Sequence, residues 1–262
     1  MLGRPCGALA ALAAVLGTLA ASPAPAWTPE SHRVIAASAA RLAPPDLHRQ
    51  IARNRDAYLL GAVDPLRDGR PEHHVKNPDG SGRLDEMIAL AVDNAIRSIR
   101  AHRPFNEIVY RLGVAAHYVA DASNPLAVAD GDPDEDRYAS DFLRYLASTE
   151  PRLRTVFYGF QPGFNGDGDL PRLVDEAVRR GRDLYPLVGR EYRRVGFRSG
   201  VETFSDRSTA FGVASVAYSH AQSDVAEVLR HVWLAAGGMD SRPRIPVRGR
   251  QVLLLPLDPA VR

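Results

Sequence analysis

Apolar residues recur at intervals of three and four along most of the chain, which is the spacing expected of amphipathic helices. The first such segment starts at Pro29, where Thr28 can act as the N-cap, and it continues to the Pro44-Pro45 pair. The last segment ends at two glycines, which favour a helix stop. The other predicted helices are short pieces at Asp46 and Tyr58, and long ones over Leu84–Arg103, Phe105–Asn124, Pro171–Tyr192 and Ser205–Ala236, the last capped by Ser205 or Asp206.

Glycine, proline and charged residues mark the loops between these helices. One loop, Asp64–Arg83, holds two adjacent histidines, and another, Asp130–Asp136, is almost wholly acidic. A single strand-like run is predicted, at Gln251–Leu255. We therefore predict an all-α fold, with one multi-helix domain over residues 27–238 and a short irregular tail over residues 239–262.

The first 26 residues have the pattern of an export signal. Arg4 gives a cationic start, an apolar run covers Gly7–Ala21, and the small-residue sequence Ala-Pro-Ala ends at Ala26. The apolar run is too short to span a bilayer comfortably. We therefore predict cleavage after Ala26 and a mature protein that is secreted or periplasmic.

Composition narrows the partners and the sources of stability. Cys6 is the only cysteine and lies in the signal, so the mature protein would form no internal disulfide. The formal net charge of +2 gives no field strong enough to favour nucleic acid as a partner. We expect packing and bound metal to supply the stability.

The candidate chemistry lies in histidines and carboxylates. His117 and Asp121 stand four residues apart on a predicted helix, so both project from one face. Alone, such a pair would more simply be a buried histidine neutralised by its carboxylate. Asp64 and the His73-His74 pair add ligands of the kind that zinc selects.

Cleavage after Ala26 would add a further donor, the α-amino group of Trp27. A free amine and the carbonyl of the same residue can chelate a cation, and His32 stands about one helical turn away. Trp27 would then bind metal through its backbone.

His220 and Asp224 repeat the same spacing in the last predicted helix. Apolar residues follow them at helical intervals, which is typical of a core helix. We predict a structural pair at this position and not a second metal site.

Taken together, these motifs resemble those of the superfamily of zinc-dependent phospholipases C and single-strand-specific nucleases, which are exported all-α hydrolases. Its members begin with a processed tryptophan followed closely by a histidine, as at Trp27 and His32. The segment that starts at His74 and the sequence HYVADASNPL, which starts at His117, are similar to the two histidine motifs of the family. The resemblance implies one zinc held by Asp64, His74, His117 and Asp121, and a second held by Trp27, His32 and Asp121. In the same view Asp64 also accepts a proton as a catalytic residue, and His73 neighbours the ligands.

The third metal site of the family is incomplete in this sequence. Ala127 stands where the family has a histidine, and Arg137 and Asp141 stand where it has a histidine and a carboxylate. We therefore expect two zinc ions. Arg137 is predicted to be a catalytic residue whose guanidinium replaces the lost positive charge against a phosphate oxygen. A surface ion pair with Asp141 is the alternative.

The resemblance implies a secreted phosphodiester hydrolase of the phospholipase C type, a monomer that contacts membrane surfaces transiently and uses a metal-activated water to attack phosphorus. A single-strand nuclease is disfavoured, because the sequence shows neither a basic groove nor aromatic platforms for bases. A third hypothesis is a metal-stabilised binding or structural protein without turnover. Ala127 and Arg137 keep that hypothesis open.

Overall fold

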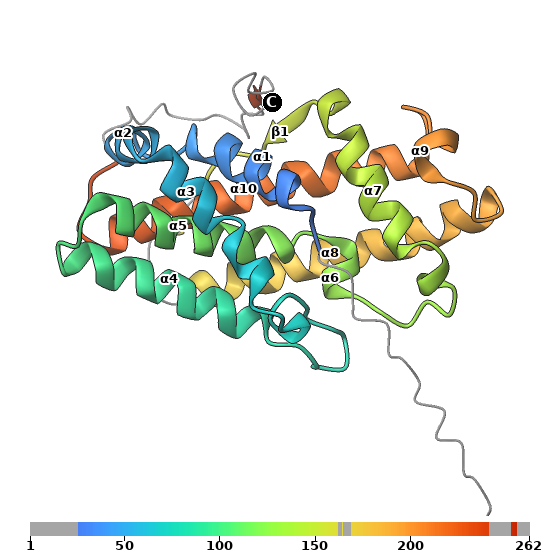
Figure 1. Cartoon of the computed structure of the whole chain (residues 1–262), viewed down its shortest axis with the longest axis horizontal. Coiled ribbons are helices and arrows are strands. Elements are labelled where there is room, and N and C mark those ends of the chain that lie inside the picture. Colours follow the sequence, from blue (N-terminus) through green and yellow to red (C-terminus); the bar gives the residue numbers. More distant parts are fainter. Residues whose placement is uncertain (1–25, 162–163, 165–168, 241–252, 256–262) are drawn as a thin grey trace, which may run out of the picture.

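The computed structural model describes residues 26–161, 164, 169–240 and 253–255, and helices make up most of it (Figure 1). The predicted all-α class is confirmed. The predicted signal segment up to Pro25 and most of the tail beyond Asp240 lie outside the described residues. The helices are α1 Pro29–Ala40, α2 Pro45–Arg53, α3 Arg55–Gly61, α4 Leu84–Arg100, α5 Phe105–Asp121, α6 Pro125–Val128, α7 Ala139–Thr149, α8 Asp169–Arg194, α9 Gly200–Thr203 and α10 Thr209–Ala235. Four short 3-10 turns are η1 Asp64–Arg67, η2 Pro71–His73, η3 Glu135–Arg137 and η4 Glu150–Arg152.

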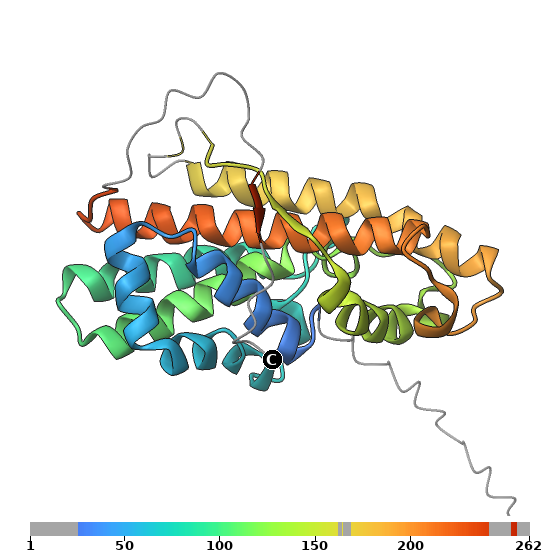
Figure 2. The same cartoon turned by 90° about the horizontal axis from the view of Figure 1, so that it is seen from above.

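Two helices organise the interior. Helix α5 packs against α3 and α4, and helix α10 packs against α5, α8 and α1. Figure 2 shows α8 and α10 side by side along the longest axis of the molecule. The apolar faces of these helices are buried together, as at Ile35, Leu112, Val119, Val225 and Val228. Burial of such faces is the main source of helix stability in a folded protein.

Glycines allow α3 and α5 to approach closely. A Cβ atom on Gly113 would lie 2.1 Å from the carbonyl oxygen of Tyr58, and one on Gly61 would lie 2.0 Å from that of Tyr110. Any larger residue at either position would have to push the helices apart. The contact brings the end of α3 next to Gly113 in the middle of α5, one helical turn before His117.

The predicted start of the first helix is confirmed, whereas that of the last one is wrong. Thr28 caps α1 by accepting a hydrogen bond from the backbone of Ser31, with 3.2 Å between Oγ1 and N. The last helix begins four residues later than predicted, at Thr209, and its cap is Ser208. The backbone carbonyl of Ser205 accepts from the Ser208 amide, so the predicted cap lies in a separate turn before the helix.

A two-stranded antiparallel sheet joins distant parts of the chain. Strand β1, Thr155–Phe157, pairs with β2, Leu253–Leu255. β2 lies inside the predicted strand-like run, whereas β1 was not predicted because three residues are too few to show a periodic pattern. Side chains of α10 hold the segment of β1, since Ser219 Oγ accepts from the amide of Val156 at 3.0 Å.

Among the described residues, no helix combines the length and the apolar character needed to cross a membrane.

Candidate metal centre

The centre of the candidate site is one face of α5. His117 and Asp121 lie one helical turn apart there, and both are completely buried. His117 Nδ1 lies 2.9 Å from the carbonyl oxygen of Ala62, at the end of α3. A carbonyl oxygen only accepts, so Nδ1 carries the proton and the lone pair of the neutral ring is on Nε2. That Nε2 lies 3.4 Å from Asp121 Oδ2.

His74 reaches the same carboxylate oxygen from the loop before α4. It directly follows η2, and its Nδ1 lies 2.9 Å from Asp121 Oδ2 and 3.1 Å from His117 Nε2. Its ring also hydrogen-bonds the backbone of Pro65, whose carbonyl is the available acceptor. Two imidazoles from distant parts of the chain therefore converge on one carboxylate oxygen.

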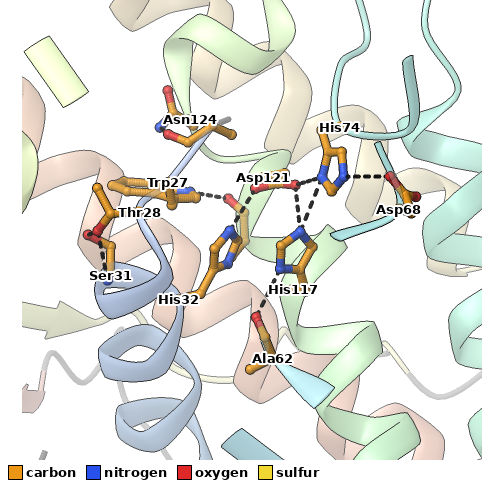
Figure 3. Close-up of polar contacts among 12 residues, drawn as sticks. Trp27, Thr28, Ser31, His32, Ala62, Asp68, His74, His117, Asp121 and Asn124 are labelled. Atoms are coloured by element: carbon orange, nitrogen blue, oxygen red, sulfur yellow. Dashed lines mark hydrogen bonds and ion pairs between the residues drawn. The ribbon is translucent and has the colours of Figure 1, made fainter. Parts of the chain in front are cut away.

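His32 approaches the other carboxylate oxygen from α1. Its Nε2 lies 3.4 Å from Asp121 Oδ1, and its ring stacks on that of His117 with 3.8 Å between centroids (Figure 3). Both ring nitrogens of His32 are buried without a hydrogen-bond partner, and so is Asp121 Oδ1. Buried polar atoms are normally paired, so three such atoms in one place indicate that the site holds a further group.

The distances between these donors fit zinc. A tetrahedral zinc ion with bonds of about 2.0–2.1 Å holds its nitrogen and oxygen ligands roughly 3.4 Å apart. The contacts of Asp121 with the three imidazoles are 2.9, 3.4 and 3.4 Å. One donor atom each from His32, His117 and Asp121 also lie within 4.8 Å of one another. The two oxygens of Asp121 face different imidazoles.

Electrostatics keep Asp121 and His32 in the states that a cation needs, whereas the pKa of His74 is raised because its interactions with Asp121 and Asp68 outweigh burial. Burial alone would raise the pKa of Asp121, but its interactions with the imidazoles of His117, His32 and His74 outweigh burial and hold the pKa well below its usual range. Burial, and then the neighbouring His117, lower the pKa of His32 well below its usual value. The cluster therefore combines an ionised carboxylate with a neutral His32 imidazole, which is the donor form.

The structure places Trp27 directly beside this cluster (Figure 3). The side chain is completely buried, its Nε1 donates to the carbonyl of Ala120 at 2.9 Å, and its ring lies 4.7 Å from that of Tyr218. These contacts fix the start of α1 against the end of α5, which carries Asp121. The role of the Trp27 α-amino group as a metal ligand stays a prediction, since this nitrogen is part of the peptide bond to Ala26 here.

The structure does not bring Asp64 to the imidazoles. Its carboxylate accepts from the hydroxyl of Tyr110 at 2.9 Å and lies 3.2 Å from the guanidinium of Arg67. Asp68, at the other end of η1, takes the position next to the histidines, with Oδ1 3.7 Å from His74 Nε2. Asp64 is the first residue of η1 and Asp68 is the C-cap residue that follows it, and the two carboxylates have different partners.

Asp68 also explains the position of His73, which we expected to neighbour the ligands. Asp68 Oδ2 lies 2.8 Å from His73 Nδ1, and the side chain of His73 is buried. Asp68 is therefore the residue near the site that the sequence analysis missed. The one signal in the sequence is the turn formed by Asp68, Gly69 and Arg70, in which the Asp68 carboxylate accepts from the Arg70 amide at 2.8 Å.

The residues at the predicted remnant of the third metal site have other contacts in the structure. Ala127 is buried, and Asp141 accepts from the Tyr192 hydroxyl and the Gly200 amide, each at 2.6 Å. Arg137 donates to Asp134 at 2.9 Å and lies over the ring of Phe197, 3.5 Å from its centroid. Arg137 thus pairs with Asp134 and not with Asp141, the alternative partner. Its contact with a phosphate oxygen stays a prediction.

Comparison with known proteins supports the fold. No protein-family model and no curated protein sequence matches the chain. The all-α fold is similar to that of a solved bacterial toxin. That structure is the alpha-toxin of Clostridium perfringens from the avian strain SWCP, with a TM-score of 0.59 and 15% sequence identity. The match covers 81% of this chain and 65% of the alpha-toxin chain, so this protein spans slightly less than two thirds of that length. At this identity the likeness concerns the fold alone.

Proposed function

We propose that this protein is an exported zinc-dependent phosphodiester hydrolase of the phospholipase C type. The observation that carries the proposal is Asp121, a completely buried carboxylate whose two oxygens face imidazoles from different segments. A buried group of this kind with unpaired polar atoms beside it is the arrangement expected of a metal site. The fold likeness to alpha-toxin and the histidine motifs agree with the proposal.

The metal would be held by residues of three segments. His74 and His117 share Oδ2 of Asp121, and His32 faces Oδ1, where the Trp27 α-amino group of the processed chain would complete the set. Bound zinc would lower the pKa of a coordinated water to about 7 and polarise a phosphoryl oxygen. The protein contributes fixed ligands, because the Ala62 carbonyl orients His117.

Asp68 orients the histidine segment in this proposal. It contacts both His73 and His74, and it takes the place predicted for Asp64. A carboxylate behind a metal-bound imidazole fixes the ring and raises its basicity. Arg137 has no part in the proposed mechanism, since Asp134 and Phe197 hold its guanidinium.

We propose two zinc ions for each chain. Ala127 offers no donor atom, and the carboxylate of Asp141 is already used by Tyr192 and Gly200. In this proposal the protein is an exported monomer that contacts a membrane only while it acts on phospholipid.

A single set of assays tests the function. The secreted protein is assayed on phosphatidylcholine vesicles, on a chromogenic phosphodiester and on single-stranded DNA, with its zinc content measured in the same preparation. We expect turnover of the chromogenic diester and the vesicles, loss of turnover with a chelator and recovery with added zinc. Turnover of DNA alone would select the nuclease. Zinc without any turnover would select the metal-stabilised binding protein, which the lost third site favours.

A further inference from the structure

A buried amide lies at the turn after α5, three residues beyond Asp121. Asn124 is completely buried and caps α6, because its Oδ1 accepts from the Leu126 amide at 2.9 Å. This contact fixes which end of the side chain carries the oxygen. The Nδ2 group therefore points the other way, where it donates to the backbone carbonyl of Ala26.

The turn that carries Asn124 is held rigidly. Ser123 Oγ donates to Asp224 on α10 at 3.0 Å, and Arg180 on α8 donates to both oxygens of that carboxylate at 2.8 Å. The Asn124 amide itself bonds back to the carbonyl of Asp121 at 2.9 Å. The direction of Nδ2 is thus set by the fold and does not depend on its acceptor. Donors fixed in advance are those that contribute most to binding charged groups.

The acceptor belongs to the residue that export processing would remove. The carbonyl carbon of Ala26 is bonded to the nitrogen of Trp27. Hydrolysis of that bond by an export peptidase consumes one water and leaves a carboxylate on the departing Ala26 and an α-amino group on Trp27. Asn124 Nδ2 then loses its partner next to the new amine. A buried donor without a partner is unfavourable, so another acceptor is expected to replace the carbonyl.

We propose that Asn124 is a substrate-positioning residue of the processed protein. Its Nδ2 donates to an anionic phosphoryl oxygen, and the carbonyl oxygen of Ala26 stands in for that oxygen in the unprocessed chain. The assignment rests on the proposed function, because it places the phosphoryl group beside the Trp27 amine and Asp121. It also means that Ala26 blocks this position until the chain is cleaved.

Equilibrium binding of inorganic phosphate tests the proposal without any turnover. The secreted chain, shown by mass spectrometry to begin at Trp27, is loaded with zinc and titrated with phosphate by calorimetry. The variants are Asn124→Leu and Asn124→Asp, and zinc content and melting temperature are measured for each. Asn54→Leu is the matched control, since the amide of Asn54 also donates to a backbone carbonyl, that of Gln50 at 2.9 Å, but at the end of α2.

We expect phosphate affinity to fall about ten- to a hundredfold in Asn124→Leu, as for loss of one hydrogen bond to a charged group. Asn124→Asp keeps the oxygen that caps α6 and places a second oxygen against the phosphate, so its affinity should fall further. This variant also covers the case in which Asn124→Leu fails to fold. Zinc content and melting temperature should stay at the wild-type level in Asn124→Asp, and Asn54→Leu should bind phosphate as the wild type does.

Three results would overturn the assignment. They are unchanged phosphate affinity in Asn124→Asp, loss of zinc in that variant, and no phosphate binding by the zinc-loaded wild type. Unchanged affinity would exclude the contact between Asn124 and phosphate. Loss of zinc would make Asn124 a structural support of the metal. Absence of phosphate binding by the wild type would leave no anion for Asn124 to position. Absence of turnover on every diester would instead refute the proposed function, because phosphate affinity is measured independently of it.

Discussion

Helices α5 and α10 each carry a histidine and an aspartate four residues apart, but the two pairs have different partners. Asp121 on α5 is in contact with His117 and with two further imidazoles from distant segments. Asp224 on α10 is in contact with Arg180 and Ser123, while His220 stacks on the ring of Tyr158 at 4.8 Å. The structural pair that we expected between His220 and Asp224 is replaced by these contacts. Equal spacing along a helix thus sets the direction of the side chains and leaves their partners open.

The charged groups around each aspartate determine whether its carboxylate can bind a cation. Burial raises the pKa of Asp224, and the charge of Arg180 opposes this, so a fixed guanidinium already neutralises the carboxylate. Burial, and then Arg180, lower the pKa of His220 to about 4, so this imidazole stays neutral near pH 7. Asp121 has only imidazoles around it and no arginine among its contacts in the described part of the chain. A divalent cation fits the environment of Asp121 and is excluded by charge from that of Asp224.

Replacing the two aspartates separately should give the largest contrast. We expect Asp121→Asn to lower zinc affinity roughly a hundredfold to several thousandfold, because removing one partner from a buried charged cluster costs about 3–5 kcal/mol. Zinc affinity is measured by competition with a chromophoric chelator. Wild-type affinity in this variant would show that Asp121 is not a ligand.

Asp224→Asn should leave zinc bound and destabilise the fold. Arg180 would keep Glu176, at 2.9 Å, but lose the buried Asp224 carboxylate, and we expect the free energy of unfolding to fall by about 1–3 kcal/mol. Denaturant unfolding followed by circular dichroism gives this value, with zinc content measured on the same sample. Loss of zinc with the fold intact would remove the distinction between the two pairs.

The two aspartates at the ends of η1 offer a second matched pair. Asp68→Asn should weaken zinc binding about ten- to a hundredfold, the range found for residues that orient metal ligands, because Asp68 contacts His73 and His74. Asp64→Asn should have little effect on zinc, since its partners are Tyr110 and Arg67. The opposite order of effects would restore the role predicted for Asp64 and refute the arrangement of this loop.

Glycines on the same two helices test how the fold supports the site. A Cβ on Gly113 would lie 2.8 Å from the amide of Ala62 as well as against Tyr58, so Gly113→Ala should push α3 away and destabilise the protein by about 1–3 kcal/mol. The Ala62 carbonyl would then move away from His117, and zinc affinity should fall too.

Gly212 on α10 is the control. It has open space around it, so Gly212→Ala should be neutral or stabilise by up to about 1 kcal/mol. Thermal unfolding of both variants, with and without zinc, measures the change in stability. Equal behaviour of the two would contradict this view of the α3 contact.

The parts of the fold that were predictable from sequence are those with a repeating signal. Helices α4 and α5 show apolar residues at helical intervals over several turns, and the predicted ranges differ from the observed ones by three residues at the ends. Strand β1 depends on a tertiary contact, that between Val156 and Ser219, which leaves no periodic pattern. The cap Ser208 is made by one local hydrogen bond from the Phe211 amide, which the neighbouring Ser205 and Asp206 could equally have offered from their positions in the sequence.

The same distinction applies to the site. Motifs and spacing identified His32, His74, His117 and Asp121 as ligand candidates, and the structure brings these four side chains together. Their role as ligands stays a prediction until metal is measured. The position of Asp68 could not be predicted, because it depends on how the loop after α3 packs, with η1 against α3 and α5 and η2 against α4.

Anomalous diffraction at the zinc edge from crystals of the secreted protein tests the metal centre most directly. We predict two peaks for each chain on either side of Asp121, one within bonding distance of His74 and His117 and one within that of His32 and the amine of Trp27. Peaks at His220 and Asp224, or no peak at Asp121 in a protein supplied with zinc, would contradict this account.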